Sequence, residues 1–540
     1  MTKYNPNRNL IRYLILYTTI LLLSIQYLEA QISFNQSNLN FNGNGDVSAV
    51  TSLSFGPDGR LYVVEYTGAI KILTIERNGP VNYNVIDNEV LNGILTIQDH
   101  NDDGTESDAS VRETIGIAVG GTATNPVFYV SSSDIRIGAG SGGGNGDVGL
   151  DTNSGVITRF AWNGTSWNVV DIVRGLPRSE ENHATNGLEL ATINGTNYLV
   201  TASGGHTNGG SPSTNFVFTC EYALSAAVLA IDLDMLDTMP ILDDNGRSYI
   251  YDIPTLDDPT RANVNGITDP DTPGYTGIDL NDPFGGNDGL NMGIIVPNGP
   301  VQILSPGYRN AYDLVVTESG ALYVTDNGAN QGWGGFPANE GSGAVTNNYI
   351  NPQPGDTGPD SDGEFINNVD HLQLVTTDLS TYDFDNTFYG GHPNPIRANP
   401  QGAGLYTDND SALGTFGPPI WRTQVYDPDG STTGSTTNIN EGLPANWPPV
   451  QNANSVEGDW RGPGINNPIV EGPNDNPVVT WGTNTNSIDE YTASNFNNAL
   501  KGNLLAGHSG GNIRRVILST DGASGTLESN FFQGIGGNVL

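Results

Sequence analysis

A recurring hairpin pattern constrains the fold of this chain more than any other feature. Alternating apolar residues flank an Asp-Gly or Ser-Gly turn in three separate segments, which are Ser52–Val64, Leu314–Val324 and Ile513–Gly522. The alternation turns one face of each strand toward a core, and the turn glycine supplies the positive φ that a tight hairpin needs. Hairpins repeated in this way are typical of β-propeller blades.

Further apolar runs occupy the chain between these hairpins. The candidates are 114–131, 155–174, 187–201, 226–233 and 504–518, spaced for three or four strands per blade. Gly accounts for 70 and Pro for 32 of the 540 residues, a composition that favours turn-rich all-β structure over disorder. The length accommodates about six blades, within the usual range of roughly four to eight. We therefore predict an all-β, six-bladed β-propeller with long loop insertions.

Both ends of the chain carry signals of their own. Basic residues precede an apolar stretch over 13–25, and a segment ending in Glu29-Ala30 follows, which is typical of a secretory signal peptide. This stretch is shorter than the ~20 residues that span a bilayer, so cleavage near Ala30 is favoured over a retained anchor. We expect a signal peptide at 1–30 and one propeller domain at 31–540. Residues 537–540 enter a strand-like pattern, which predicts an incomplete last blade and a truncated C-terminus.

The composition excludes several partners. With 59 acidic against 20 basic residues the net charge is −39, which disfavours nucleic acid and anionic membranes. The same acidity favours divalent cations in loops, although it also serves solubility alone. The single cysteine, Cys220, excludes an internal disulfide, and no segment after residue 30 has spanning length without Gly, Pro or charge. We predict an exported protein, either secreted, on the cell surface or periplasmic, with no membrane span in the mature chain.

Four long polar, glycine-rich loops interrupt the strand pattern. They cover 138–150, 234–299, 328–370 and 426–475. Loops of this length in a compact domain usually cover a cleft or bind ions, and disordered insertion is the alternative. For 138–146 the insertion is the preferred interpretation.

Common catalytic motifs are poorly supported. No His-x-x-x-His or His-Glu-x-x-His pair is present, so a helical zinc protease site is disfavoured. The Gly-x-Ser-x-Gly match at 507–511 is followed by a strand-like run, where a nucleophile elbow needs a helix. The Gly-x-Gly-x-x-Gly match at 144–149 opens no helix, which argues against a nicotinamide domain. Oxidation by another bound cofactor fits the sequence better.

His183 is the leading candidate for a catalytic base. It lies in the stretch LPRSEENHATNGLEL, just before a strand-like run. An alcohol or hemiacetal delivers hydride only after its hydroxyl proton is drawn off, and an imidazole of near-neutral pKa suits that step. A surface loop histidine is the alternative interpretation.

A second motif is GYRNAYDLVVTESGALYVTDNG at 307–328. Together with the Leu-Pro and Asn-His elements before it, this motif resembles the glucose/sorbosone dehydrogenase family, soluble propeller enzymes that use pyrroloquinoline quinone (PQQ). The resemblance covers roughly 47–540 apart from the long insertions. It implies that His183 is the general base and that Arg309, Asn310 and Asn327 contact PQQ, a planar tricarboxylate that needs a guanidinium and amides. A structural role for Arg309 between blades is the alternative.

The resemblance also implies calcium. Its ligands would include the carbonyls of Gly328 and Ala329, and Tyr389 lies in a Tyr-Gly-Gly-His-Pro run similar to a family motif. A separate loop, DHNDDGTES, alternates oxygen ligands as a calcium loop does, with Ser110 in place of the final glutamate, which predicts a structural or weak site. Its candidate ligands are Asp99, Asn101 and Asp103.

Three positions depart from the family pattern. Asn182 stands where the family has an aspartate, and the next acidic position appears as Ser203-Gly204-Gly205-His206, so we assign Asn182 and His206 to substrate binding. The family lysine for PQQ is absent, because His508, Ser509 and Gly510 occupy that place. Losing that charge would weaken PQQ binding.

These observations lead to two functional hypotheses. The first is a secreted PQQ-dependent aldose dehydrogenase that oxidises a sugar at its anomeric carbon and passes electrons to an external acceptor. The second is a non-catalytic propeller that binds polysaccharide or a surface protein. The enzyme requires His183, Arg309 and Asn327 to converge on one cavity large enough for a flat cofactor.

Overall fold

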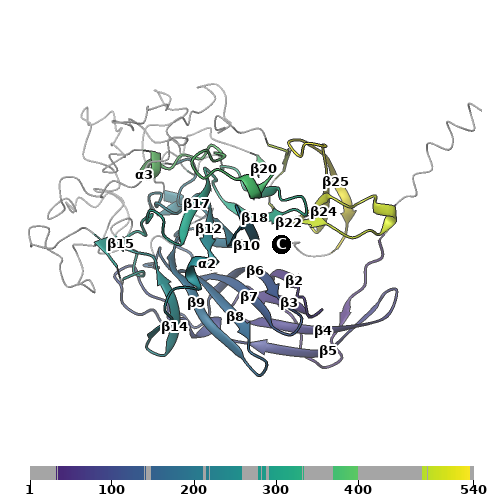
Figure 1. Cartoon of the computed structure of the whole chain (residues 1–540), viewed down its shortest axis with the longest axis horizontal. Coiled ribbons are helices and arrows are strands. Elements are labelled where there is room, and N and C mark those ends of the chain that lie inside the picture. Colours follow the sequence, from purple (N-terminus) through teal and green to yellow (C-terminus); the bar gives the residue numbers. More distant parts are fainter. Residues whose placement is uncertain are drawn as a thin grey trace, which may run out of the picture.

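The fold is a ring of β-sheets. The computed structural model describes residues 32, 34–138, 140, 148–210, 214–217, 219–257, 278–280, 282–286, 291–330, 333, 369–398, 477–482 and 484–535. Five sheets of four or more strands, here called blades 1 to 5 in chain order, surround a common centre (Figure 1). The predicted all-β propeller is confirmed, with five blades described against the six predicted. The signal-peptide segment, the final residues 537–540 and most of the predicted loops 138–150, 328–370 and 426–475 lie outside the described residues. The prediction of a loop over 234–299 is wrong in part, because this segment contains a short helix and four strands, two of which extend blade 2.

Blades 1 and 2 each contain four antiparallel strands in sequence order, with additional strands at the outer edge. In blade 1, β1 pairs in parallel with β5, and in blade 2, β14 pairs in parallel with β9. The strands of blade 1 are β1 Leu39–Asn40, β2 Val50–Phe55, β3 Leu61–Glu65, β4 Ile70–Gly79 and β5 Asn82–Leu91. Those of blade 2 are β6 Glu113–Gly121, β7 Pro126–Ser133, β8 Gly155–Trp162, β9 Trp167–Leu176, β13 Leu242–Asp244 and β14 Arg247–Asp252.

Blades 3 to 5 are regular four-stranded antiparallel sheets. Blade 3 has β10 Thr185–Ile193, β11 Thr196–Ser203, β12 Ala227–Asp232 and β17 Val301–Pro306. Blade 4 has β18 Ala311–Val316, β19 Leu322–Asp326, β20 Asp370–Thr376 and β21 Val479–Trp481, and blade 5 has β22 Thr485–Tyr491, β23 Asn503–His508, β24 Asn512–Leu518 and β25 Gly525–Gln533. Strands β15 Thr255–Leu256 and β16 Ile278–Asp279 form a small separate sheet.

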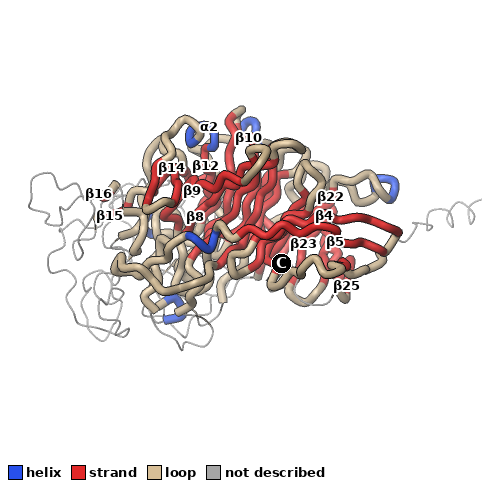
Figure 2. Tube along the Cα trace, turned by 90° about the horizontal axis from the view of Figure 1, so that it is seen from below, coloured by secondary structure: helices blue, strands red, loops and turns tan. Residues whose placement is uncertain are grey.

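Across the described ranges, helices are few and short, and strands make up most of the regular structure (Figure 2). The α-helices found there are α2 Leu233–Leu236 and α3 Pro395–Ala398, and the 3-10 turns are Ile94–Thr96, Thr214–Phe216, Leu379–Thr381 and Phe496–Asn498. None of the helices in the described part of the chain has the length and apolar character that a membrane crossing requires.

The predicted hairpins and strand runs are confirmed. The segment 52–64 forms most of β2 and β3, 314–324 forms β18 and β19, and 513–522 covers β24 and its turn. At the turn of the first hairpin, Gly59 has a φ of +77°, and at that of the second, Gly320 has +86°. These left-handed values are open to glycine at little cost, which explains the Asp-Gly and Ser-Gly signals.

The hydrophobic core lies between neighbouring blades. Between blades 1 and 2, for example, Tyr62, Ile72 and Phe128 are buried, and Phe128 stacks on Phe160 at 4.6 Å between ring centroids. Similar clusters lie between blades 2 and 3, 3 and 4, and 4 and 5. This packing of sheet on sheet leaves the first strand of each blade next to the centre of the ring, where polar side chains can project.

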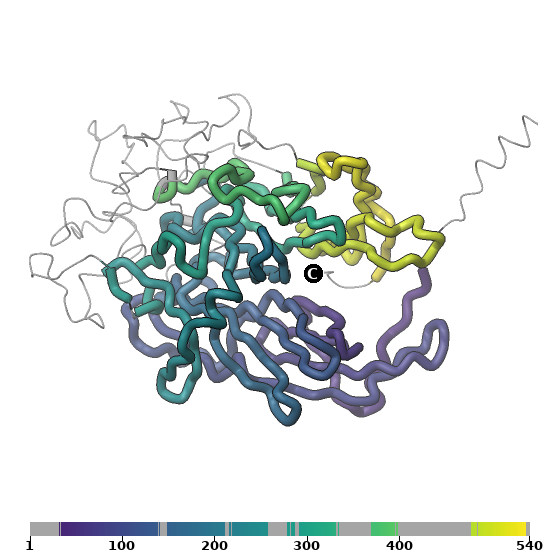
Figure 3. The backbone as a smooth tube through the Cα atoms, in the orientation of Figure 1, coloured from purple at the N-terminus to yellow at the C-terminus, as the bar shows by residue number. Residues whose placement is uncertain are grey.

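The N-terminal segment connects the first and last blades (Figure 3). β1 pairs with β5 of blade 1, whereas the Phe34 ring packs against Phe531 and Phe532 of blade 5 with centroids 5.6 and 5.5 Å away. The Gln36 amide also donates to the Ile535 carbonyl at 2.8 Å. The segment therefore ties together two parts of the ring that are almost 500 residues apart in sequence.

Candidate active site

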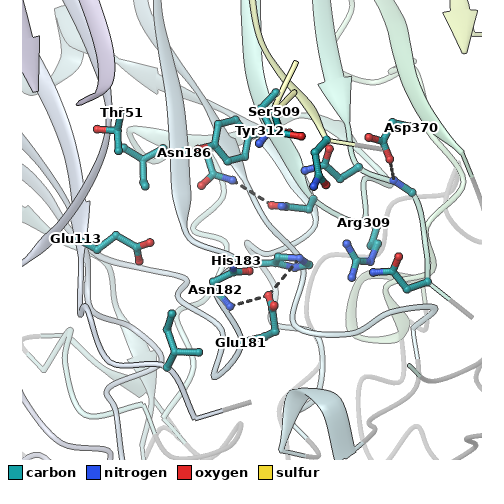
Figure 4. A pocket seen from close by; sticks show the side chains of 18 of the residues that line it. Thr51, Glu113, Glu181, Asn182, His183, Asn186, Arg309, Tyr312, Asp370 and Ser509 are labelled. Carbon is teal, nitrogen blue, oxygen red and sulfur yellow. Dashed lines mark hydrogen bonds and ion pairs between the residues drawn. The ribbon is translucent and has the colours of Figure 1, made fainter. Parts of the chain in front are cut away.

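A cavity of about 430 Å³ lies where the first strands of the five blades meet (Figure 4). Each of these strands contributes at least one polar lining residue. They are Thr51 of β2, Glu113 of β6, Asn186 of β10, Tyr312 of β18 and Asn486 of β22. The volume lies in the range of small-molecule and cofactor sites. Residues from the connecting loops complete the lining, and these loops carry the predicted catalytic groups.

Arg178 holds the loop between β9 and β10 in place. This loop follows Pro177, and the Arg178 side chain is fully buried. Its guanidinium donates to the backbone carbonyls of Asp134 and Arg136, both at 3.0 Å, and to those of Ser179 and Glu181 within the loop. An arginine can satisfy several carbonyls at once because its five N–H donors are fixed in a plane. The loop that presents His183 is therefore rigidly attached to blade 2.

His183 lies in the cavity wall with its ring fixed. Its Nδ1 is 2.7 Å from the Gly205 carbonyl oxygen, which can only accept, so Nδ1 carries the proton of the neutral ring. The other nitrogen, Nε2, then has a free lone pair and lies 3.4 Å from Glu181 Oε2. Burial lowers the pKa of His183 well below its ordinary value, and the positive charge of Arg309 lowers it further. His183 is therefore neutral at pH 7, with Nε2 as a proton acceptor.

Arg309 carries the positive charge of the cavity. The side chain is buried, its Nε donates to Asn208 Oδ1 at 3.2 Å, and its guanidinium carbon lies 5.9 Å from the centre of the Phe216 ring and 5.8 Å from that of Trp333. Among the described residues no carboxylate lies within ion-pair distance of it. Burial lowers the pKa of Arg309, and the charge of Glu181 opposes that shift. A buried guanidinium without a contacting anion favours an anionic or carbonyl-rich ligand.

Asn310 and Asn327 also line the cavity. Asn310 is held from both sides, since its backbone N–H donates to Asp326 Oδ1 at 2.9 Å and its side-chain oxygen accepts from Asn186 Nδ2 at 3.1 Å. Its amide nitrogen remains for a ligand. The side-chain oxygen of Asn327 is buried and has no hydrogen-bond partner among the residues that the structure describes. Such an orphaned acceptor is costly, and a bound cation or donor would satisfy it.

The predicted calcium ligands are only partly brought together. Gly328 lines the cavity, and its backbone N–H donates to Asp370 Oδ1 at 3.2 Å, while Ala329 is buried next to it. Tyr389 is buried but is not part of the cavity wall, and its hydroxyl donates to the His392 carbonyl at 3.1 Å. Within the described ranges no group of three or more His, Cys, Asp or Glu side chains is arranged to hold a metal ion.

The loop at 99–103 lies outside the cavity wall, and protein partners use its side-chain oxygens. Asp99 forms a buried ion pair with Arg112, Asn101 accepts from Arg136 at 2.7 Å, and the Asp103 carboxylate accepts from the N–H and hydroxyl of Thr105. These contacts point the three predicted ligands to different partners rather than to a common centre. The weak calcium site predicted there remains a prediction without a ligand arrangement to support it.

The two residues assigned to substrate binding differ in position. Asn182 lies in the cavity wall beside Glu181, whereas His206 is completely buried outside the wall and packs against Tyr222 with ring centroids 4.4 Å apart. Burial lowers the pKa of His206 to about 4, which keeps it neutral. The position of His206 gives it no direct contact with a ligand in the cavity.

Several lining residues were not predicted. Glu113, Glu181 and Asp370 add three carboxyl groups to the cavity. Glu181 is two residues before His183, and its proximity in sequence could have singled it out. Glu113 and Asp370 lie in blades 2 and 4, and no local sequence signal connects them with the site.

Comparison with known proteins found similarity in structure alone. Neither a family model nor a curated protein matches the chain. Similar solved structures include the PQQ-bound aldose sugar dehydrogenase of Streptomyces coelicolor, with 12% identity over 91% of this chain and 84% of that chain, and a TM-score of 0.37. Another is a calcium structure of a Trichoderma reesei carbohydrate-active enzyme of family AA12, with 12% identity over 92% of this chain and 83% of that chain, and a TM-score of 0.39.

A third is the holo form of the PQQ domain of Coprinopsis cinerea pyranose dehydrogenase, with 12% identity over 89% of this chain and 78% of that chain, and a TM-score of 0.36. Two of these three proteins are named as PQQ-containing sugar dehydrogenases. At this identity and TM-score the three similarities assign no role to any residue of this chain.

Proposed function

We propose that this protein is a quinone-dependent sugar dehydrogenase that oxidises an aldose at its anomeric carbon, with His183 as the general base. The observation that carries the proposal is that His183, Arg309 and Asn327, which are distant in sequence, line one cavity. In this proposal residues 1–30 direct the protein out of the cytoplasm, where an external acceptor takes up the electrons.

The residues present fit PQQ in shape and in donors. The cavity is large enough for a flat ligand, the Arg309 guanidinium lies next to two aromatic rings, and the amides of Asn310 and Asn327 face the same space. These three residues would hold the cofactor. When bound, PQQ supplies a quinone carbonyl that accepts hydride, and a divalent cation polarises that carbonyl.

A tricarboxylate in this cavity needs more positive charge than Arg309 supplies. Arg309 is the one basic side chain in the described cavity wall, and three carboxyl groups also line it. Glu113 is neutralised by its ion pair with Arg178 at 3.0 Å, and burial raises the pKa of both Glu181 and Asp370. A tricarboxylate therefore meets a single free positive charge, and a divalent cation beside Asn327 Oδ1 would supply the rest.

The protein groups can perform the proton transfer. In this proposal Nε2 of His183 takes the hydroxyl proton of the sugar, and the Gly205 carbonyl, which lies 2.7 Å from Nδ1, stabilises the imidazolium. Arg309 and burial keep the ring neutral before the reaction, so that it starts as a base. The His183 residue is only 2% exposed, which limits contact of its ring with bulk water.

A second candidate function follows from the carboxyl groups. Three acidic side chains with Trp333 and several amides also form a suitable surface for sugar hydroxyls, as in a non-catalytic polysaccharide-binding propeller. This alternative needs neither PQQ nor a proton acceptor.

Titration of the purified protein with PQQ in the presence and absence of calcium, followed by dye reduction with a panel of aldoses, tests the proposal. We expect saturable, calcium-dependent binding and turnover, and we expect His183→Gln to bind PQQ with similar affinity but to lose turnover. Folded protein that binds sugars and not PQQ would refute the dehydrogenase and support the binding propeller.

A further inference from the structure

The depressed basicity of His183 raises a chemical problem for its proposed role. A general base works best when its pKa lies near the operating pH. Burial and the charge of Arg309 both disfavour the imidazolium, so His183 by itself would be a weak base. A neighbouring group that favours the protonated ring would solve this problem.

Glu181 is placed to be that group. Its Oε2 lies 3.4 Å from His183 Nε2, and both side chains are largely buried in the cavity wall, with exposures of 9% and 2%. The Glu181 carboxylate is oriented by its own loop, since Oε2 accepts the Asn182 backbone N–H at 2.6 Å. When the Asn182 side-chain amide is turned to donate, its nitrogen lies 2.9 Å from Oε1. Figure 4 shows the carboxylate between Asn182 and the imidazole ring.

The proton count of this pair follows from the geometry. Nδ1–H of His183 is committed to the Gly205 carbonyl, so in the neutral ring Nε2 presents a lone pair toward Glu181. A carboxylate oxygen and a lone pair at this separation repel each other, and one added proton converts the repulsion into an attraction. The pair therefore takes up a first proton more readily than either group would alone.

The surrounding charges are compatible with a single added proton. Arg309 and His206 disfavour a positive charge on His183, whereas Glu221 favours it. Arg309 and Arg178 favour a negative charge on Glu181, while burial raises the pKa of that carboxyl group. A second proton on the pair would place a buried imidazolium near Arg309 with no facing anion at Glu181, which is unfavourable.

We infer that Glu181 and His183 act as one proton acceptor, in which Glu181 is a positioning residue that raises the basicity of His183 Nε2 and shares the proton taken from the substrate. The substrate O–H bond breaks and an Nε2–H bond forms. The proton then lies between Nε2 and Glu181 Oε2, while the hydride goes to the quinone acceptor. The catalytic part of this inference rests on the proposed function, but the shared proton does not.

Histidine-selective ¹⁵N NMR of the cofactor-free protein tests the inference directly. The chain has only six histidines, and His183→Gln assigns the His183 signals. We expect the neutral wild-type ring to carry its proton on Nδ1. We also expect Glu181→Gln to lower the pH midpoint of Nε2 protonation by about 1–3 pH units, because an opposite charge at this distance is lost. Glu181→Asp, which keeps the charge on a shorter side chain, is expected to give a smaller shift.

Glu76→Gln is the control for the loss of a carboxylate, since Glu76 is exposed on β4 and is not part of the cavity wall. It should leave the His183 midpoint unchanged. An unchanged midpoint in folded Glu181→Gln would overturn the shared proton and leave Glu181 with a structural role. If that variant does not fold, the ¹⁵N spectrum of the wild-type protein still tests the inference. A neutral His183 ring that carries its proton on Nε2 would contradict the shared proton.

Different results would contradict the dehydrogenase function and the shared proton. A midpoint shift in a protein that neither binds PQQ nor reduces dye supports the proton pair and removes its catalytic role. Turnover in the wild type with no midpoint shift in Glu181→Gln supports the dehydrogenase and rejects the pair.

Discussion

Two glutamate–histidine pairs lie in or next to the cavity wall, and they differ in burial and in the hydrogen bonds that their carboxylates accept. In the cavity wall, Glu181 lies 3.4 Å from His183. Behind the wall, Glu221 lies 2.8 Å from His392 Nε2 and is completely buried. Glu221 and His392 are not part of the cavity wall, whereas Glu181 and His183 both line the cavity.

The number of donors separates the two carboxylates. Glu221 also accepts the backbone N–H groups of His206 and Thr207, both at 3.0 Å, and the hydroxyls of Thr207 and Ser225. With this support its pKa falls to about 2 despite burial, and hydrogen bonding to His392 is the largest favourable cause. Burial instead raises the pKa of Glu181. Many donors make a carboxylate a permanent structural charge, and few donors leave it able to exchange a proton.

Removal of the Glu221 carboxylate should have the largest effect on stability. Glu221→Ala would leave a buried histidine, two hydroxyls and two N–H groups without their acceptor, and we expect a loss of about 3–5 kcal/mol in the free energy of unfolding. Glu181→Gln should cost less than about 1 kcal/mol. Denaturant unfolding of the two variants measures the difference, and equal losses would contradict the distinction between the pairs.

The pH dependence of that loss sharpens the same comparison. The pKa of Glu221 is lowered on folding from an ordinary value of 4.5 to about 2, so its stabilising contribution is present above pH 4.5 and disappears as the pH falls toward 2. The gap in unfolding free energy between wild type and Glu221→Ala should therefore be constant from pH 7 to 5 and shrink at lower pH. A gap that grows below pH 4.5 would reverse the assigned sign.

The two histidines should differ in their effect on turnover. We expect His183→Gln to reduce kcat for aldose oxidation by about 10²–10⁴-fold, the usual contribution of a general base, with little change in stability. The corresponding His392→Gln should mainly reduce stability. Steady-state kinetics with thermal unfolding distinguishes them, and retained turnover in His183→Gln would exclude it as the base.

Arg309 links the charge of the cavity to the basicity of His183. Arg309→Met should weaken PQQ binding by about 1.5–3 kcal/mol, the value of a hydrogen bond to a charged group. It should also raise the pKa of His183, because the neighbouring positive charge is removed. PQQ titration and the His183 NMR midpoint give two independent measurements. Arg309→Lys is the control that keeps the charge but loses the planar donors.

Tyr389 should show the smallest effect. Its hydroxyl donates to the His392 carbonyl, and it does not line the cavity. Tyr389→Phe should cost about 1 kcal/mol of unfolding free energy and leave PQQ and calcium affinity unchanged. Weaker cofactor binding in this variant would restore Tyr389 to the metal site that the motif predicts.

Local sequence signals predicted the strands and part of the cavity. The hairpins around Gly59 and Gly320 were predictable because a left-handed turn between alternating apolar residues has few other solutions. Arg309 and Asn310 follow a glycine turn immediately before β18, and their motif placed them at the end of an inner strand. Tyr389 and His206 have similar local signals, yet packing directs both away from the cavity. Short motifs do not determine side-chain direction.

By itself, the sequence determined the class of fold, the hairpins that build its blades and the loop that carries His183, because these depend on alternation and turn chemistry within a few residues. Only the tertiary structure decided that Glu113 and Asp370 share a cavity with His183. It also decided that Glu181 lies beside His183 in the cavity wall, while Glu221 is fully buried and accepts several hydrogen bonds. Those properties depend on burial and on the number of converging donors, which for Glu221 come from loop residues far apart in sequence.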